Sequence, residues 1–324
     1  MHGPADPVRS LRMTAAELAR ATWRLDARNP LVRPPFPSPI IADPTFLPPD
    51  ETPDGRWHLF AHSLFGVHHH VSADGIVWRR RARVCGNALR AFLHREGGAY
   101  HLLYERCRLM LPMRRASWYS HIEMRTSTDL ERWSDPIVLL RPSLAWHHEP
   151  GGGAAVGNPC LLRTERGYRL YYSAGLVRLT DCGFDEPRHI GIAEAPALSG
   201  PFAPRPEPIL SPQADDPFAN LGAGAMKVLP VDDGVVGFQN GIYWDATARH
   251  SGSAVRLLGS ADGLAFTPLA PPFLRPASGW MRSHVYAVDV RRVGRELVLY
   301  FNARSAWHWL AGREAIGRAT AELA

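Results

Sequence analysis

The chain has 324 residues, and 45% of them are hydrophobic, which suffices for a full core in one large domain or two smaller ones. The net charge is +6, and the arginines that produce it are spread along the chain, so nucleic acid is not expected as a partner. The four cysteines form no CxxC pair, which favours buried thiols over metal ligands.

Nothing in the sequence points to a membrane or to export. No apolar run approaches the length of a membrane-spanning helix, so no membrane partner is expected. The first residues lack the apolar stretch of a signal peptide, which favours a cytoplasmic protein. The oligomeric state leaves no signal in the sequence.

Residues 1–39 are expected to form an N-terminal segment of their own. Met13–Arg28 is predicted to be one helix, because Thr14 and Glu17 can form a capping box and apolar residues follow at helical spacing. Asn29-Pro30 ends this pattern. The proline-rich residues 33–39 are then expected to lead into the main domain as an extended segment.

Residues 40–324 contain a recurring short phrase. Its clearest copies are Ser72-Ala-Asp-Gly-Ile-Val-Trp78 and Ser260-Ala-Asp-Gly-Leu-Ala-Phe266, with a looser copy at 127–133 and a degenerate one at 194–202. The copies start 55, 67 and 66 residues apart (127−72, 194−127 and 260−194). A period of this size indicates a repeat architecture. We interpret Asp74 and Asp262 as turn residues, with the aromatic residue of each phrase filling the gap between repeats.

Each repeat has the same order of predicted strands. A first strand is followed by a glycine turn, a second strand rich in aromatic and aliphatic residues, a third strand and the phrase. The predicted second strands are 57–62, 100–104, 168–172, 235–238 and 296–301. Five such units predict an all-β fold, a five-bladed β-propeller with a short N-terminal helix.

Polar residues at the starts of the first strands are expected to converge on one pocket at the mouth of the channel. These starts are 41–46, 86–90, 157–160, 221–227 and 282–286. Asp43 stands out, because a carboxylate followed by proline at a channel-lining strand start can serve as a general base or accept a sugar hydroxyl. The alternative is a capping role in an Asx-Pro turn.

Over residues 40–320 this pattern resembles the five-bladed β-propeller glycosidases, which are glycoside hydrolase family 43, its relative family 32 and the family 130 mannoside phosphorylases. Ala42-Asp-Pro-Thr-Phe46 resembles the family 43 motif whose Asp is the general base. Asn158-Pro159 stands where that family has a second Asp-Pro, which tunes the acid and orients the substrate. Gly222-Ala-Gly-Ala-Met-Lys227 stands where its acid Glu would be, and is similar to the phosphate-side Gly-x-Gly motif of family 130.

The chain departs from both families at residues that the resemblance marks as catalytic. Asn158 replaces the second Asp of family 43, and residues 222–227 contain no carboxylate. The catalytic Asp of family 130 would align with Ala88. Glycoside cleavage normally needs two carboxyl groups, so a second one must come from elsewhere. Glu186, in what the sequence suggests is a long third-blade loop, is our first choice for the acid, followed by Glu105; Glu149 is a further candidate.

Several other residues are candidates for substrate binding. Arg90, Arg282 and Lys227 are cations that could hold a phosphate or carboxylate, and Trp118 could stack on a sugar. Asn158 and His284 begin channel-lining strands. No metal or other cofactor is expected, although the resemblance allows a central calcium ion near His284. His68–His70 is predicted to be a surface turn rather than a metal site, because alternate side chains of a strand point to opposite faces.

The sequence therefore favours a glycan-active enzyme whose partner is a carbohydrate or glycoside. A glycoside hydrolase acting on a furanoside or pentoside is the leading interpretation, with Asp43 as base and Glu186 or Glu105 as acid. Three alternatives stay open: a glycoside phosphorylase, a carbohydrate-binding propeller without catalysis, and an enzyme repurposed for small-molecule biosynthesis. The substrate and reaction follow from the resemblance alone, because one fold hosts many functions.

Overall fold

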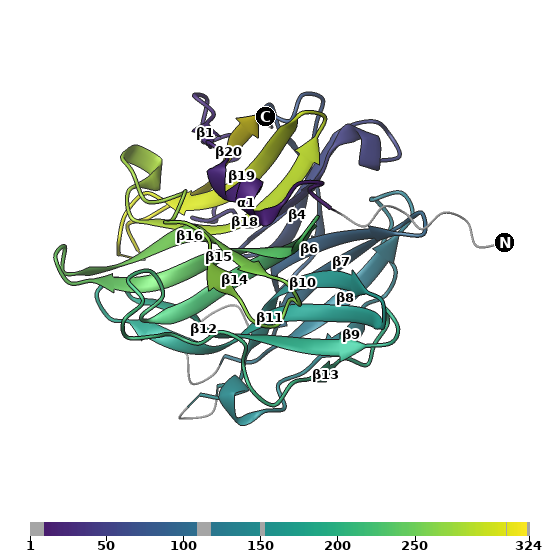
Figure 1. Cartoon of the computed structure of the whole chain (residues 1–324). Coiled ribbons are helices and arrows are strands. Elements are labelled where there is room, and N and C mark those ends of the chain that lie inside the picture. Colours follow the sequence, from purple (N-terminus) through teal and green to yellow (C-terminus); the bar gives the residue numbers. More distant parts are fainter. Residues whose placement is uncertain (1–9, 109–117, 150–152, 309, 323–324) are drawn as a thin grey trace.

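The fold is a ring of five four-stranded antiparallel sheets, as the sequence predicts (Figure 1). It is seen in a computed structural model that describes residues 10–108, 118–149, 153–308 and 310–322. Each sheet is one blade, and its strands follow one another from the channel to the outside of the ring. The described part of the chain has no helix whose length and apolar character would suit a membrane span.

The strands divide evenly among the blades. Blade 1 contains β2 (Ala42–Leu47), β3 (Trp57–Ser63), β4 (Gly66–Ser72) and β5 (Arg79–Cys85). Blade 2 contains β6 (Ala88–Glu96), β7 (Ala99–Cys107), β8 (Ser120–Ser127) and β9 (Ile137–Leu140). Blade 3 contains β10 (Val156–Thr164), β11 (Gly167–Leu179), β12 (Phe184–Ala195) and β13 (Ala203–Pro204). Blade 4 contains β14 (Gly222–Val231), β15 (Gly234–Asp245), β16 (His250–Ser260) and β17 (Thr267–Pro268). Blade 5 contains β18 (His284–Val293), β19 (Glu296–Arg304), β20 (Glu314–Glu322) and β1 (Arg24–Leu25).

The N-terminal segment takes part in closing the ring. β1 pairs with β20, so the first strand of the chain completes the blade that the last strands build (Figure 1). The helix α1 spans only Ala15–Arg20, and the prediction of one helix over 13–28 is wrong in its length. The predicted capping box of Thr14 and Glu17 is confirmed. A helix of two turns gains little by extending, whereas Arg24 and Leu25 gain the backbone hydrogen bonds of a sheet.

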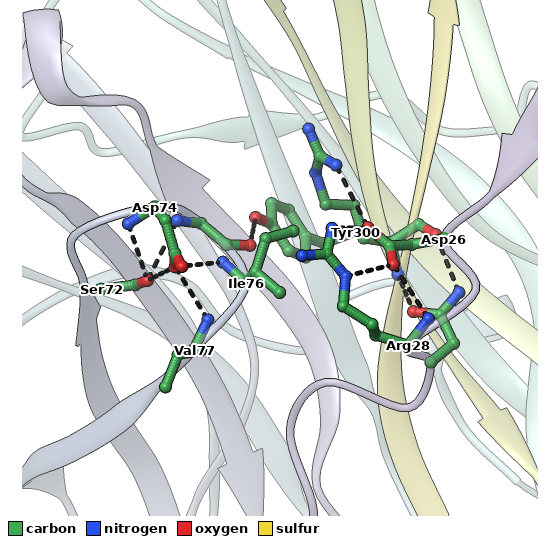
Figure 2. A network of polar contacts seen from close by, with 10 residues as sticks. Asp26, Arg28, Ser72, Asp74, Ile76, Val77 and Tyr300 are labelled. Carbon is green, nitrogen blue, oxygen red and sulfur yellow. Dashed lines mark hydrogen bonds and ion pairs between the residues drawn. The ribbon is translucent and has the colours of Figure 1, made fainter.

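The recurring phrase builds the same turn in three blades. Ser72 Oγ and Asp74 Oδ1 accept hydrogen bonds from the backbone N–H groups of the residues that follow, including those of Ile76 and Val77 at 2.9 Å (Figure 2). The Ser127 and Ser260 copies repeat this pattern of contacts. The structural interpretation of Asp74 and Asp262 is therefore confirmed.

The aromatic residue of each phrase lies between blades. In Figure 2, Tyr300 of blade 5 reaches the turn of blade 1, where its hydroxyl donates to the carbonyl of Gly75. Edge-to-face ring pairs with centroids 5.6 to 6.1 Å apart join each phrase to the preceding blade: Trp78 with Tyr300, Trp133 with Phe60, and Phe266 with Tyr171. Such pairs add stability beyond their buried area, which explains why the phrase recurs.

The histidine run of blade 1 lies in the core rather than on a surface turn. His68, His69 and His70 belong to β4 and are each at most 4% exposed, so the predicted surface turn is wrong. Their side chains do alternate, as expected. His69 Nε2 contacts His58 Nδ1 at 2.8 Å, whereas His68 Nε2 contacts Ser63 Oγ at 2.7 Å. The four cysteines are buried and free, as predicted.

Candidate active site

Each first strand carries a bulge at the same point. Two residues of the first strand face a single residue of the second, between residues 42 and 45, 89 and 92, 157 and 160, 222 and 225, and 285 and 288. A bulge bends its strand and redirects one side chain. The residues that open the five bulges are Asp43, Arg90, Asn158, Ala223 and Tyr286. In four blades the residue that opens the bulge lines the cavity at the centre of the ring, whereas in blade 4 Ala225, on the other side of the bulge, does so instead.

Three of these residues have left-handed backbone conformations that side chains disfavour. The φ angles are 50° at Asp43, 51° at Arg90 and 50° at Asn158. Asp43 and Asn158 also precede proline, which restricts them further. In blade 4 the left-handed residue is Gly224, the second of its bulge, where a Cβ would collide with the carbonyl of Asn240. Strain of this kind gathers at functional sites, where the surrounding structure holds it.

The bulges surround a cavity of about 460 Å³ to which all five blades contribute. Five residues predicted for the site line it: Asp43, Arg90, Trp118, Asn158 and Glu186. Eight polar or charged lining residues escaped the sequence analysis: His62, Arg178, Asp185, Asn240, Tyr286, Asn302, Arg304 and Glu314. Four carboxyl groups, those of Asp43, Asp185, Glu186 and Glu314, therefore line one cavity.

Glu186 is a buried carboxyl group on a strand. It lies in β12 opposite Val177 of β11, so the predicted long loop is instead an extension of the β11–β12 hairpin. Burial is the main cause that raises the pKa of Glu186, to about 8. The Arg90 charge opposes this shift, and the charges of Glu314 and Asp43 add to it. A hydrogen bond with Tyr286 holds the carboxyl group. At neutral pH Glu186 is consequently mostly protonated and able to give a proton.

Asp43 makes a hydrogen bond through its backbone N–H, and its carboxyl group makes a longer contact with a histidine. Its N–H donates to Asn302 Oδ1 at 3.1 Å, and its Oδ2 lies 3.3 Å from His62 Nδ1. Burial and then the Arg90 charge lower the pKa of His62 to about 3, so this contact is not an ion pair at neutral pH. Burial raises the pKa of Asp43, whereas the charges of Arg90 and Lys227 lower it.

Glu314 uses both of its oxygens to hold neighbours. Its Oε1 accepts from Arg304 Nη1, and its Oε2 accepts from Asn302 Nδ2, each at 3.0 Å. The donation by Nδ2 leaves Asn302 Oδ1 to accept from Asp43 N–H, so a chain of contacts runs from Arg304 to the strained backbone of Asp43. Burial raises the pKa of Glu314 to about 6, although Arg304 opposes the shift.

Glu105 fixes Arg90 instead of facing the cavity. It is fully buried and does not line the cavity, and its Oε2 lies 2.8 Å from Arg90 Nη1. Trp118 Nε1 donates to its other oxygen at 3.3 Å. Gly157 makes room for this carboxylate, because a Cβ at that position would collide with it. Glu105 therefore serves as the ion-pair partner of Arg90, and Glu186 is better placed than Glu105 to act as the acid.

Four other candidates lie away from the cavity. Lys227 Nζ donates to the Pro159 carbonyl at 2.8 Å, and Arg282 lies over the ring of Trp307. Glu149 Oε1 accepts from the backbone N–H of Leu176. His284 precedes the bulge of its blade by two residues, so Tyr286 takes the position that we expected it to occupy. None of the four is among the residues that line the cavity.

The surroundings of His284 do not suit a calcium ion. Its ring packs against Phe184 and Tyr286, with centroids 5.9 and 5.7 Å away. Calcium takes six to eight oxygen ligands. Among the described residues, no group of three or more His, Cys, Asp or Glu side chains is arranged to hold a metal.

Comparison with known proteins identifies the fold but no close relative. No family model and no curated protein matches the chain. A solved structure described as a glycoside hydrolase is 12% identical, with a TM-score of 0.63 over 97% of this chain and 92% of its own. The β-1,2-mannobiose phosphorylase of Listeria innocua is 10% identical, with a TM-score of 0.59 over 93% and 97%. An exo-1,5-α-L-arabinanase from a bovine ruminal metagenomic library is 14% identical, with a TM-score of 0.55 over 91% and 95%.

These likenesses place the chain on the five-bladed propeller scaffold of glycoside hydrolases and a glycoside phosphorylase. The resemblance stated from the sequence is thereby confirmed at the level of the fold. The identities are too low to transfer an activity, so the function has to be argued from the cavity itself.

Proposed function

We propose that this protein is a glycoside hydrolase that works through Asp43 and Glu186. The observation that carries the proposal is a pair of carboxyl groups in one cavity with different environments. Burial raises the pKa of both carboxyl groups and the Arg90 charge opposes the rise at both, but Glu314 and Asp43 raise the pKa of Glu186 further, to about 8, whereas Lys227 adds to the offset at Asp43. Pairs of this kind divide the roles of acid and base between them.

In the proposed reaction, Asp43 takes a proton from water as the water oxygen bonds to the anomeric carbon. The bond from that carbon to the glycosidic oxygen breaks, and Glu186 gives its proton to the departing oxygen. This single displacement inverts the anomeric carbon. Arg90, Asn158 and Trp118 would bind the sugar, because they line the same cavity.

A furanoside or pentoside is our proposed substrate. Support comes from the motif at 42–46, which resembles family 43, and from the likeness in fold to an arabinanase. Phosphorolysis is the second candidate, favoured by the arginines at the cavity, which are Arg90, Arg178 and Arg304, and by the likeness in fold to a phosphorylase.

The test is a panel of nitrophenyl glycosides, with and without inorganic phosphate, applied to the wild type, Asp43→Asn and Asp74→Asn. Asp74 lies in a turn outside the cavity, so Asp74→Asn is the same substitution at a position away from the site. We expect turnover without phosphate that Asp43→Asn abolishes and Asp74→Asn leaves intact. Turnover only with phosphate would favour the phosphorylase. Turnover that survives in Asp43→Asn would contradict the proposal, and no turnover on any sugar would favour a binding or repurposed propeller.

A further inference from the structure

The spread of arginines along the chain has one exception, at the outer edge of blade 1. Arg79, Arg80, Arg81 and Arg83 all lie in β5, the outermost strand of that blade. All four are exposed. Four cations within five residues make β5 a basic strip on the outside of the ring.

Blades 3, 4 and 5 protect their edges without such a strip. An exposed edge strand is commonly blunted by shortness, proline or a charge, which prevents pairing with other chains. The outermost strands of blades 3 and 4 have two residues each and end on proline, and that of blade 5 also has two residues. β5 has seven residues, so it is both the longest outer strand and the only described one with a run of arginines.

Within the part of the chain that the structure describes, most of the charge of the strip has no counter-charge. Arg81 forms an ion pair with Glu131. Among the described residues, no hydrogen bond or ion pair engages the side chains of Arg79, Arg80 or Arg83. The neighbouring strand places His70 opposite Arg80 and His68 opposite Arg83. Burial and the charges of Arg80 and Arg83 lower the pKa of His68 to about 4, so His68 is uncharged at neutral pH and does not balance the charge of the arginines.

The strip runs toward the face of the propeller that carries the cavity. β3 ends at that face, because His62 near its end lines the cavity. β5 runs parallel to β3, since each is antiparallel to β4 between them, so its Arg83 end points to the same face. Three strand spacings of about 4.8 Å separate β2 from β5, so roughly 15 Å lies between the strip and the Asp43 strand. A polymer on the strip could extend to the cavity.

We propose that β5 is a binding surface for an anionic polysaccharide, which it holds through carboxylate or sulfate groups. Arginine suits both groups because its planar guanidinium donates two parallel hydrogen bonds. β5 contains no aromatic residue, and Trp78 before it packs on Tyr300, so the strip lacks the stacking platform that single-stranded nucleic acids use. The choice of a polysaccharide rests on the proposed function, because the same class of polymer would then reach the cavity.

The test measures binding to the full-length protein by fluorescence anisotropy in the cold, without any turnover. The probes are labelled polygalacturonate for carboxylates, heparin for sulfates, neutral dextran, and a single-stranded DNA 20-mer. The variant Arg79→Gln/Arg80→Gln/Arg83→Gln removes the unpaired cations. Its matched control, Arg141→Gln/Arg188→Gln/Arg295→Gln, removes three exposed arginines from blades 2, 3 and 5, and so has the same net charge.

We expect the wild type and Asp43→Asn to bind at least one acidic polysaccharide and not dextran. The β5 variant should bind at least about tenfold more weakly, with the slope of log K against log salt reduced by about two to three. The control should stay within twofold of the wild type. Equal weakening in both variants, no binding to either acidic polysaccharide, or tenfold tighter binding of DNA would overturn the proposal. Binding is measured without turnover, so the two proposals can fail separately. If the protein hydrolyses no glycoside but passes this binding test, the proposal for β5 stands and only the proposed hydrolase function is rejected.

Discussion

The inner and outer ends of the blades repeat in different ways. At the outer turns the phrase keeps its residues, so Ser72 and Asp74 make the same hydrogen bonds as Ser260 and Asp262. At the inner bulges the same shift of the backbone register recurs five times, but the residues that open the bulges are Asp, Arg, Asn, Ala and Tyr. A repeat that keeps its side chains maintains the scaffold. A repeat that keeps its backbone and varies its side chains builds a site.

This contrast predicts that matched substitutions will separate function from stability. Substitutions at inner positions should lower turnover without lowering stability, because strained and buried charged groups cost stability. Outer positions should do the reverse.

Asp43→Asn should lower kcat/KM by at least about a thousandfold, because a general base and its charge are both lost. Asp262→Asn makes the same change in an outer turn and should leave kcat/KM within twofold. Steady-state kinetics on whichever glycoside the panel identifies will measure both. Comparable losses in the two variants would remove the distinction between inner and outer positions.

Glu186→Gln should stabilise the protein, and more so at higher pH. The pKa of Glu186 is about 8 in the folded state, above the ordinary value of 4.5, so the folded state holds the proton more tightly. Wild-type stability is therefore lost as pH rises through 8. The amide has no such loss, so we expect a gain of a few kcal/mol at pH 9 and little at pH 5. Urea unfolding at both pH values measures it. The exposed Glu165→Gln serves as control, and a gain independent of pH would refute this account of Glu186.

The contacts between Glu314, Asn302 and Asp43 predict a rescue. Glu314→Gln turns the acceptor that faces Asn302 Nδ2 into a donor, which should flip the Asn302 amide and deprive Asp43 N–H of its acceptor. We expect a ten- to hundredfold loss of kcat with little change in KM. Adding Asn302→Asp restores an acceptor for both neighbours and should recover most of kcat.

Exchange of the Asp43 amide hydrogen, followed by NMR, gives a second readout that needs no activity. It should accelerate in Glu314→Gln and return toward the wild-type rate in the double variant. A double variant that stays as impaired as the single one in both measurements would show that the contact chain does not position Asp43.

Asp74→Ala should have the smallest effect, about 1 kcal/mol of unfolding free energy, with kcat unchanged. The substitution removes the acceptor of two backbone N–H groups at an exposed turn (Figure 2). Asp74→Asn keeps an acceptor and should lie closer to the wild type. Chemical denaturation with parallel activity assays makes the comparison. A loss of turnover in folded Asp74→Ala would be evidence that the turn serves the site.

The sequence predicted the parts of the structure that repeat. The spacing of the phrase and the glycine turns led to five blades, and the starts of first strands led to Asp43, Arg90 and Asn158. The helix was predicted too long, because pairing of Arg24 and Leu25 with β20 depends on a strand almost 300 residues later in the chain. Local patterns hold no signal of such a contact.

Glu314 was missed, although its place in the fold follows a simple rule. Like Glu186, it lies near the start of a third strand, and third strands begin at the same face as first strands because neighbouring strands alternate in direction. Applying that rule to every third strand would have found Glu314. Tyr286 has no such signal, because no proline or glycine marks the bulge of blade 5, and His284 two residues earlier is the more conspicuous polar residue.

The most direct test of the central claim compares leaving groups. The kcat/KM values of Asp43→Asn and Glu186→Gln would be measured on two glycosides of the same sugar, one with a dinitrophenyl leaving group and one with an alkyl leaving group. An acid matters less when the leaving group departs without a proton. Glu186→Gln should therefore retain most activity on the dinitrophenyl glycoside and lose it on the alkyl glycoside, whereas Asp43→Asn should lose both. Equal losses of Glu186→Gln on the two substrates would contradict its role as the acid, and with it the proposed division of labour in the cavity.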